Sequence, residues 1–248
     1  MKALITYLRI QLKIDLRDKG TLLNYYLVPL AFFLVMGAVF SSITPAMKDS
    51  LSATMSIFAI TMGAVMGAPI SLVRMRESNT LRAFKANGIP AAAVLAVHAL
   101  SAFIHLFIVS AVIYFLTPLL FKAAFPAAPG FFFLCAALYL LACIGLGMLI
   151  GVIAPSQAYT TMFSMVLFMP TILFSGIMFP ASMLPGALGW LGKVLPATYS
   201  LQSFYGLAYR TPADIQPSLA VSIVAAFAVL SFTLAVWRLN SLKKTEQN

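Results

Sequence analysis

The sequence predicts an all-α membrane protein with six transmembrane helices. Its composition points away from a soluble domain, because charged residues make up 9% of the 248 residues and hydrophobic residues 62%. Six long apolar stretches follow one another along the chain, and the basic residues fall mainly on one side of them. Only a helix satisfies its own backbone hydrogen bonds across a bilayer within one segment, so each stretch is expected to be a helix.

The six stretches have about the length that a spanning helix needs, roughly 17–25 residues for a hydrocarbon core of about 30 Å. We place the predicted spans at Leu22–Ile43, Ser52–Val73, Ala91–Thr117, Gly130–Ile153, Tyr159–Met178 and Ile215–Trp237. Because these spans take up most of the chain, residues 1–248 are expected to form one membrane domain without a separate soluble domain.

The distribution of basic residues predicts the orientation. With the N-terminus in the cytoplasm, twelve of the 16 Lys and Arg residues face inward, which follows the positive-inside rule. The inward residues are Lys2, Arg9, Lys13, Arg17, Lys19, Arg74, Arg76, Arg82, Lys85, Arg238, Lys243 and Lys244, and the outward ones are Lys48, Lys122, Lys193 and Arg210. An even number of spans brings both termini into the cytoplasm. We therefore expect a multi-pass protein of the cell membrane, whose net charge of +10 serves contact with anionic lipid or an acidic partner rather than nucleic acid.

Residues 1–20, before the first span, have the pattern of an amphipathic helix lying on the inner leaflet. The basic residues fall on one side of a helical wheel and the leucine and isoleucine residues on the next. Asp15 interrupts the apolar side. The alternative is a charged leader that only sets the topology.

The first cytoplasmic loop, residues 74–90, predicts a capped helix of about two turns. Ser78 or Asn79 suits its N-cap, Gly88 suits the position after its C-cap, and Leu81 and Phe84 share one face. So short a helix is unstable alone in water, so a partner surface or the neighbouring spans should hold it. The alternative is a solvated connector.

Residues 179–210 are apolar, yet Pro and Gly interrupt them too often for a span. We expect two short helices, near Leu184–Leu195 and Thr198–Tyr209, that enter the outer leaflet and return as a re-entrant segment.

The fifth span has a polar stripe along one helix face. Its members follow at intervals of three or four residues: Gln157, Thr161, Ser164, Phe168, Thr171 and Ser175. The stripe either lines a substrate pathway or contacts a second subunit, or it only packs helices together. The pairs Gly63–Gly67 and Gly147–Gly151 indicate close helix approach.

Catalytic, metal and cofactor sites are not predicted. The six Asp and Glu residues sit at loops, ends or interfaces, and the single Gly-Lys pair, Gly192-Lys193, lacks both the first glycine and the following Ser or Thr of a P-loop. His98 and His105 lie seven residues apart, on one face of the third span. They could touch a metal, a haem or a proton, but two ligands on one helix do not chelate a small ion, and hydrogen bonding between helices is the simpler reading.

Two segments are similar to one known family. The residues 76–81, Arg-Glu-Ser-Asn-Thr-Leu, with Gly-Ile-Pro at 88–90, are similar to the E-x-G-T-L-E…T-P coupling segment of the ABC-2 type permeases of ABC exporters. Residues 174–180, with Leu-Pro-Ala-Thr-Tyr at 195–199, resemble the exit of that family's fifth span and its re-entrant turn. The chain departs from the pattern at Asn79, where glycine is frequent, and at Arg82, where an acid is common.

The resemblance implies a permease subunit that uses a separate cytoplasmic ATPase. The ATPase would dock on the coupling segment through Arg74, Arg76, Glu77, Leu81, Arg82, Phe84 and Lys85, with Glu77 paired to a basic residue of that partner. A second permease chain, identical or similar, would complete the pathway. This chain would bind no cofactor of its own, since ATP and Mg would sit on the partner ATPase.

The predicted cargo is an amphipathic or lipid-like compound, such as a drug, an antibiotic or a lipid-linked glycan, because the stripe is uncharged and has Met and Phe residues beside it. Two other functions fit the topology. One is a membrane scaffold or immunity protein that sequesters a compound without transport. The other is a membrane enzyme that uses His98 and His105.

Overall fold

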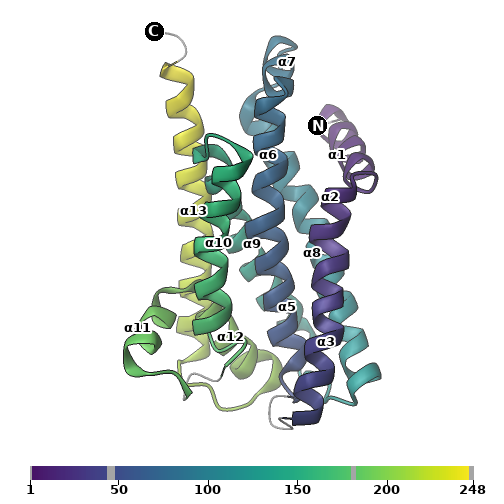
Figure 1. The fold of residues 1–248 in the computed structure, drawn as a ribbon, viewed down its shortest axis with the longest axis vertical. Coiled ribbons are helices and arrows are strands. Elements are labelled where there is room, and N and C mark those ends of the chain that lie inside the picture. Colours follow the sequence, from purple (N-terminus) through teal and green to yellow (C-terminus); the bar gives the residue numbers. More distant parts are fainter. Residues whose placement is uncertain (1, 44–47, 180–182, 246–248) are drawn as a thin grey trace.

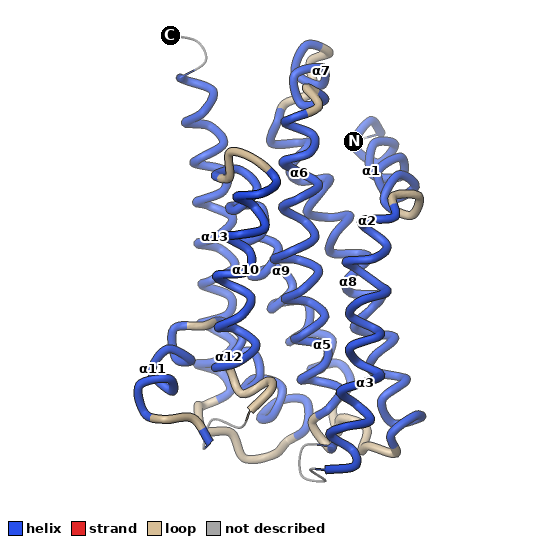
Figure 2. Tube along the Cα trace, viewed as in Figure 1, coloured by secondary structure: helices blue, strands red, loops and turns tan. Residues whose placement is uncertain are grey.

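The protein is all-helical. The computed structural model describes residues 2–43, 48–179 and 183–245, of which 84% are in helices and none in a strand. Figure 1 shows long helices standing side by side along the longest axis of the molecule. In Figure 2 most of the described loops lie at the two ends of this bundle.

Six of the described helical stretches are long and apolar enough to cross a membrane, so the six predicted spans are confirmed. The first consists of α2 (Lys19–Leu22), η1 (Leu23–Leu27) and α3 (Val28–Ile43), and the second of α5 (Leu51–Thr61), η2 (Met62–Gly67) and α6 (Ala68–Glu77). The other four are α8 (Ala91–Phe121), α9 (Pro129–Ile153), α10 (Gln157–Phe174) and α13 (Pro217–Thr245). The η segments are π-helical turns within or beside α-helices.

Two of the span boundaries that differ from the prediction have a local cause in the backbone. The second span continues to Glu77, because the first strong break of the helix is Asn79, whose φ is 58°. Arg74, Arg76 and Glu77 therefore lie on the last turn of a spanning helix, not in a loop. The fifth span ends at Phe174 rather than Met178, because Gly176 adopts a φ of 85°, a left-handed conformation that ends helices.

Helix α9 forms the centre of the bundle and packs against α13, α6, η2 and α8. Its small residues allow close contact, since a Cβ atom added to Gly147 would lie 2.1 Å from the backbone oxygen of Ala64. A Cβ atom added to Gly63 would meet the side chain of Leu106 at 2.2 Å. The close approach predicted for the two glycine pairs is therefore confirmed at these positions.

The two ends of the bundle are of different kinds. The N-terminus, α7 (Thr80–Ala86) and the C-terminal end of α13 lie at one end in Figure 1, and α11 (Gly186–Val194) and α12 (Pro196–Ser203) lie at the other. The predicted pair of short helices is present, and η4 (Phe204–Tyr209) extends the second of them. Residues 180–182 of the predicted re-entrant segment lie outside the described residues. Re-entry into a leaflet stays a prediction.

Helix α1 (Lys2–Asp15) packs against α8. Several of its apolar side chains are exposed, among them Leu4, Ile5, Ile10 and Ile14. Asp15, the residue that breaks the amphipathic pattern, is buried instead, and Ser101 of α8 donates a hydrogen bond of 2.5 Å to it. A polar residue on the apolar side is thus explained by a polar partner on the neighbouring helix.

Candidate functional site

The end of α6 brings three of the predicted coupling residues into contacts within the chain. Arg76 Nη1 donates hydrogen bonds to the backbone oxygens of Gly151, Val152 and Ala154, at 3.0, 3.1 and 2.9 Å. These carbonyl groups end α9 and have no partner within that helix. Arg76 therefore caps α9 and ties the second span to the fourth.

Glu77 and Arg74 also have partners within the chain. The Glu77 carboxylate accepts hydrogen bonds from the backbone N–H and the side-chain amide of Gln157, at the first turn of α10. Arg74 forms an exposed ion pair of 3.2 Å with Asp18. Each residue therefore has a contact within the chain. Both side chains also remain accessible to solvent, so both could still contact a docking partner.

The predicted coupling helix is present as α7, with seven residues. Positive φ values occur just before and after it, at Asn79 and Gly88, and the Ile89 N–H donates to the Phe84 carbonyl as in helices that end with a left-handed residue. Phe84 faces α1, because its ring lies 5.2 Å from that of Tyr7. Leu81 is half-buried. The side chains of Arg82 and Lys85 lie outside the described part of the structure.

The polar stripe of α10 is mostly buried within the chain. Ser164 donates a hydrogen bond of 2.6 Å to the backbone oxygen of Val65, and the Phe168 ring lies 5.8 Å from that of Phe58. Thr171 and Ser175 are also buried. Ser175 lies just past the helix, as its C-cap residue.

Two members of the stripe are more accessible. Thr161 is exposed, and Gln157 is half-buried beside Glu77. The face of α10 beside the stripe is exposed and rich in methionine, including Met162, Met165 and Met169. That the stripe lines a substrate pathway or forms a dimer surface stays a prediction. Because most of the stripe is buried, this role requires α10 to separate from α5 and η2 during transport.

His98 and His105 point toward the N-terminal elements. Tyr26 OH and His105 Nδ1 lie 2.5 Å apart, and His105 Nε2 lies 3.8 Å from the Asp15 carboxylate. Among the described residues no three His, Cys, Asp or Glu side chains form a group that could hold a metal ion. The contact with Tyr26 is a hydrogen bond between helices, as predicted from the sequence for these histidines.

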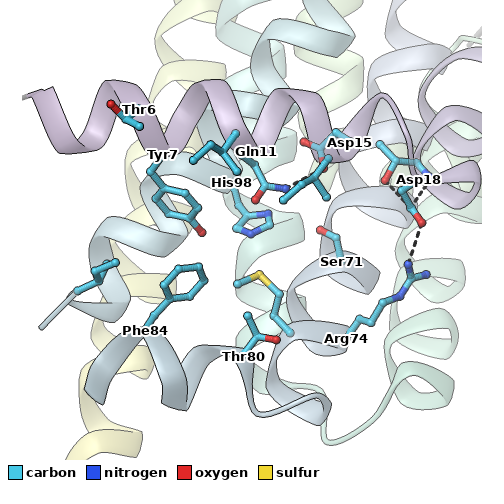
Figure 3. A pocket seen from close by; sticks show the side chains of 15 residues that line it. Thr6, Tyr7, Gln11, Asp15, Asp18, Ser71, Arg74, Thr80, Phe84 and His98 are labelled. Atoms are coloured by element: carbon cyan, nitrogen blue, oxygen red, sulfur yellow. Dashed lines mark hydrogen bonds and ion pairs between the residues drawn. The ribbon is translucent and has the colours of Figure 1, made fainter. Parts of the chain in front are cut away.

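A cavity of about 610 Å³ lies between α1, α6, α7 and the start of α8. Figure 3 shows Tyr7, Phe84 and His98 close to one another in its lining. Sequence reasoning did not find this cavity. Two sequence features lie near it: Asp15 on the apolar side of α1, and Ser101 between the two histidines. Neither feature predicts which residue it contacts, because that depends on how the helices pack.

The ionisable groups of the N-terminal segment respond to this packing. Burial raises the pKa of Tyr7 to about 12, and the charge of Asp15 adds to the effect. For Asp18, burial acts to raise the pKa, but hydrogen bonds from Thr21 and the ion pair with Arg74 outweigh it, so the pKa lies below its usual value. Asp18 is also the N-cap of α2, since its carboxylate accepts from Thr21 N at 2.9 Å.

Comparison with known proteins gives two matches. Residues 2–209 match the model of the ABC-2 type transporter family. A stretch of 95 residues is 28% identical to Nodulation protein J of Rhizobium meliloti (strain 1021). That stretch covers 38% of this chain and 36% of the relative, so the similarity extends over about a third of the relative's length.

Proposed function

Since this chain belongs to the ABC-2 type transporter family, which its residues 2–209 match, we propose that it is the permease subunit of an ATP-driven exporter. The family and the six apolar helices make it a multi-pass transmembrane transporter component. The proposal adds that a separate cytoplasmic ATPase supplies the energy. It also adds that the cargo is amphipathic or lipid-like and leaves the cell, as the uncharged, methionine-rich surroundings of α10 favour.

The observation that best supports this proposal is the position of α7. This helix connects the second span to the third, and it lies at the end of the bundle that also holds both termini. A displacement of α7 by a partner would therefore act directly on two spans. The two positive-φ residues at its ends, Asn79 and Gly88, set its direction relative to α6 and α8.

A second permease chain and membrane lipid are the other proposed partners. Large apolar side chains are exposed on α3, α10 and α13, for example Val35, Val166 and Val229. Such a surface is unsuited to water and suited to lipid tails or to another copy of the chain. Both termini are proposed to lie in the cytoplasm of a cell membrane.

Co-purification tests the docking step. The tagged permease, expressed with its candidate ABC ATPase, should retain that ATPase through purification. The double variant Glu77→Ala, Leu81→Ala should lose it, because a docking surface without its charged pair and apolar anchor commonly loses 2–5 kcal/mol or more. The control is Leu4→Ala, an exposed apolar position on α1.

A second control separates docking from internal contacts. Gln157→Ala removes the amide that binds Glu77 and leaves the Glu77 carboxylate available for the ATPase. We expect this variant to retain the ATPase. Retention by the double variant, with cargo-stimulated hydrolysis unchanged, contradicts docking through Glu77 and Leu81. A wild-type permease that retains no ATPase and stimulates no hydrolysis favours a scaffold that does not respond to ATP.

A further inference from the structure

The cavity beneath α7 has the size and lining of a ligand site. Its volume of about 610 Å³ lies within the range of small-molecule pockets. Apolar atoms form most of its wall, and its apolar side chains include Ile10 and Ile14 of α1, Met75 of α6 and Phe84 of α7. An occupant with an apolar body would fit this wall.

One wall of the cavity carries a buried polar atom without a partner. His98 is 6% exposed, and its Nε2 has no hydrogen-bond partner among the described residues. Figure 3 shows its ring in the lining of the cavity beside Tyr7, whose hydroxyl group also has no partner in the described part of the chain. A buried polar atom left unpaired is costly, so these two groups favour an occupant that forms hydrogen bonds.

The lining carries a net negative charge. The lining includes the carboxylates of Asp15 and Asp18 and the guanidinium of Arg74. Arg74 is paired with Asp18, whereas Asp15 accepts hydrogen bonds from two neutral groups, the Gln11 amide at 2.8 Å and the Ser101 hydroxyl. With the histidines uncharged, one negative charge is therefore left without a bonded cation, although His105 Nε2 lies 3.8 Å away.

We propose that this cavity binds a lipophilic amine, an apolar chain or ring system that ends in a protonated amino group. The ammonium group would lie near the Asp15 carboxylate and donate a hydrogen bond to His98 Nε2, and the apolar part would contact Ile10, Met75 and Phe84. The negative charge selects a cation over an anion, and with the imidazole proton on Nδ1 the unpaired Nε2 of His98 accepts a hydrogen bond from the ammonium group. Binding is a property of the permease alone, so it goes beyond the proposed export function.

Occupancy would act on α7. The cavity wall includes Phe84 and Thr80 of α7 together with residues of α1 and α6, so an occupant contacts both the proposed lever and the helices that support it. A ligand with different affinity for two positions of α7 shifts their populations. The site would thus link the presence of an amine to the docking surface of the ATPase.

The test uses the full-length permease in phosphatidylcholine nanodiscs with the variant Met75→Cys as reporter. The native Cys135 and Cys143 are buried, so a maleimide should react mainly at position 75. Dodecylamine should slow this reaction about ten-fold at saturation, and dodecanol and dodecanoate should require higher concentrations for the same effect. The variant Ile5→Cys, exposed on α1 and outside the lining, should be unaffected.

Two further variants connect binding to the proposed groups. Asp15→Asn should raise the half-protecting dodecylamine concentration about ten-fold, equivalent to about 1.4 kcal/mol, and leave that of dodecanol unchanged. Because Asp15 also holds α1 to α8, His98→Phe provides a second variant that keeps that contact; it too should reduce the preference for the amine. Size-exclusion profiles check that each variant is folded.

Each outcome decides the proposal. Equal protection by amine and alcohol, equal slowing of the Met75→Cys and Ile5→Cys variants, or full amine preference in both folded variants overturns it. Protection in discs that contain phosphatidylethanolamine, without added amine, supports the same chemistry and identifies a lipid headgroup as its source. Loss of export with amine binding intact contradicts only the proposed transport.

Discussion

Arg76 stabilises the fold of this chain, although its position in the sequence suggests contact with a partner protein. The resemblance to the coupling segment implies contact with an ATPase, whereas the structure places its guanidinium on three carbonyl oxygens at the end of α9. Hydrogen bonds that involve a charged group are stronger than neutral ones, and unpaired carbonyl groups at a helix end are costly. The neighbouring Arg74 has only one exposed ion pair.

Arg76→Ala should therefore destabilise the permease by about 2–3 kcal/mol, the cost of losing a hydrogen-bonded charged group. Arg74→Ala, the matched control, should cost less than about 1 kcal/mol, because exposed ion pairs contribute little. Thermal unfolding of both variants in the same detergent measures the difference. Equal melting temperatures for the two variants would show that the α9 cap contributes no stability.

Asp18 predicts a dependence of stability on pH. Its pKa is lowered in the folded protein, despite burial, by Thr21 and Arg74, so its contribution is present above the ordinary pKa of about 3.9 and is lost as the pH falls through the lower folded value. The melting temperature of the wild type should therefore fall more steeply between about pH 5 and pH 3 than that of Asp18→Asn. Parallel curves for the two proteins would contradict this role, and Asp49→Asn, which removes an exposed carboxylate elsewhere, controls for the change of charge.

At the scale of helices, the bundle depends on close contacts made by glycine. Gly147 of α9 faces the backbone of η2, and the atom that an added Cβ would meet is the carbonyl oxygen of Ala64. A backbone atom moves only with its helix, so a side-chain rotation cannot relieve the clash. Gly189 of α11 has no other atom within 4 Å of such a Cβ.

Gly147→Ala should destabilise the protein by about 1–3 kcal/mol, as overpacking of a tight core does. Gly189→Ala should be neutral or slightly stabilising, because alanine favours a helix over glycine by up to about 1 kcal/mol. The melting temperature and the yield of monodisperse protein report both effects. If Gly147→Ala behaves like Gly189→Ala, then α9 and η2 are farther apart in the membrane than in this structure.

For the whole molecule, the arrangement of the ends agrees with the charge pattern. Both termini and α7 lie at one end, which is the end that carries most Lys and Arg residues, and α11 and α12 lie at the other. The positive-inside rule predicts that the basic end of such a protein faces the cytoplasm. The coupling helix would then face the compartment that holds ATP.

Cysteine labelling of intact cells tests this orientation. A membrane-impermeant maleimide added outside should react with Lys193→Cys and Arg210→Cys, whose native side chains are exposed, and should not react with Lys85→Cys. The Lys85→Cys variant should react after the cells are opened. Labelling at position 85 in intact cells would reverse the proposed topology.

The sequence by itself determined the number of spans, their approximate limits, the short helix at 80–86 and the break at Gly88. These features depend on local properties: the length of apolar stretches, the backbone freedom of glycine and the placement of charge. The tertiary structure decided which residues meet. Ser164 bonds to Val65, Arg76 to α9, and Ser101 to Asp15, across 75 to 99 positions of sequence. Such pairings cannot be predicted from a single sequence, because they depend on how the helices rotate and pack against one another. The cavity between α1 and α7 exists only as a result of that packing.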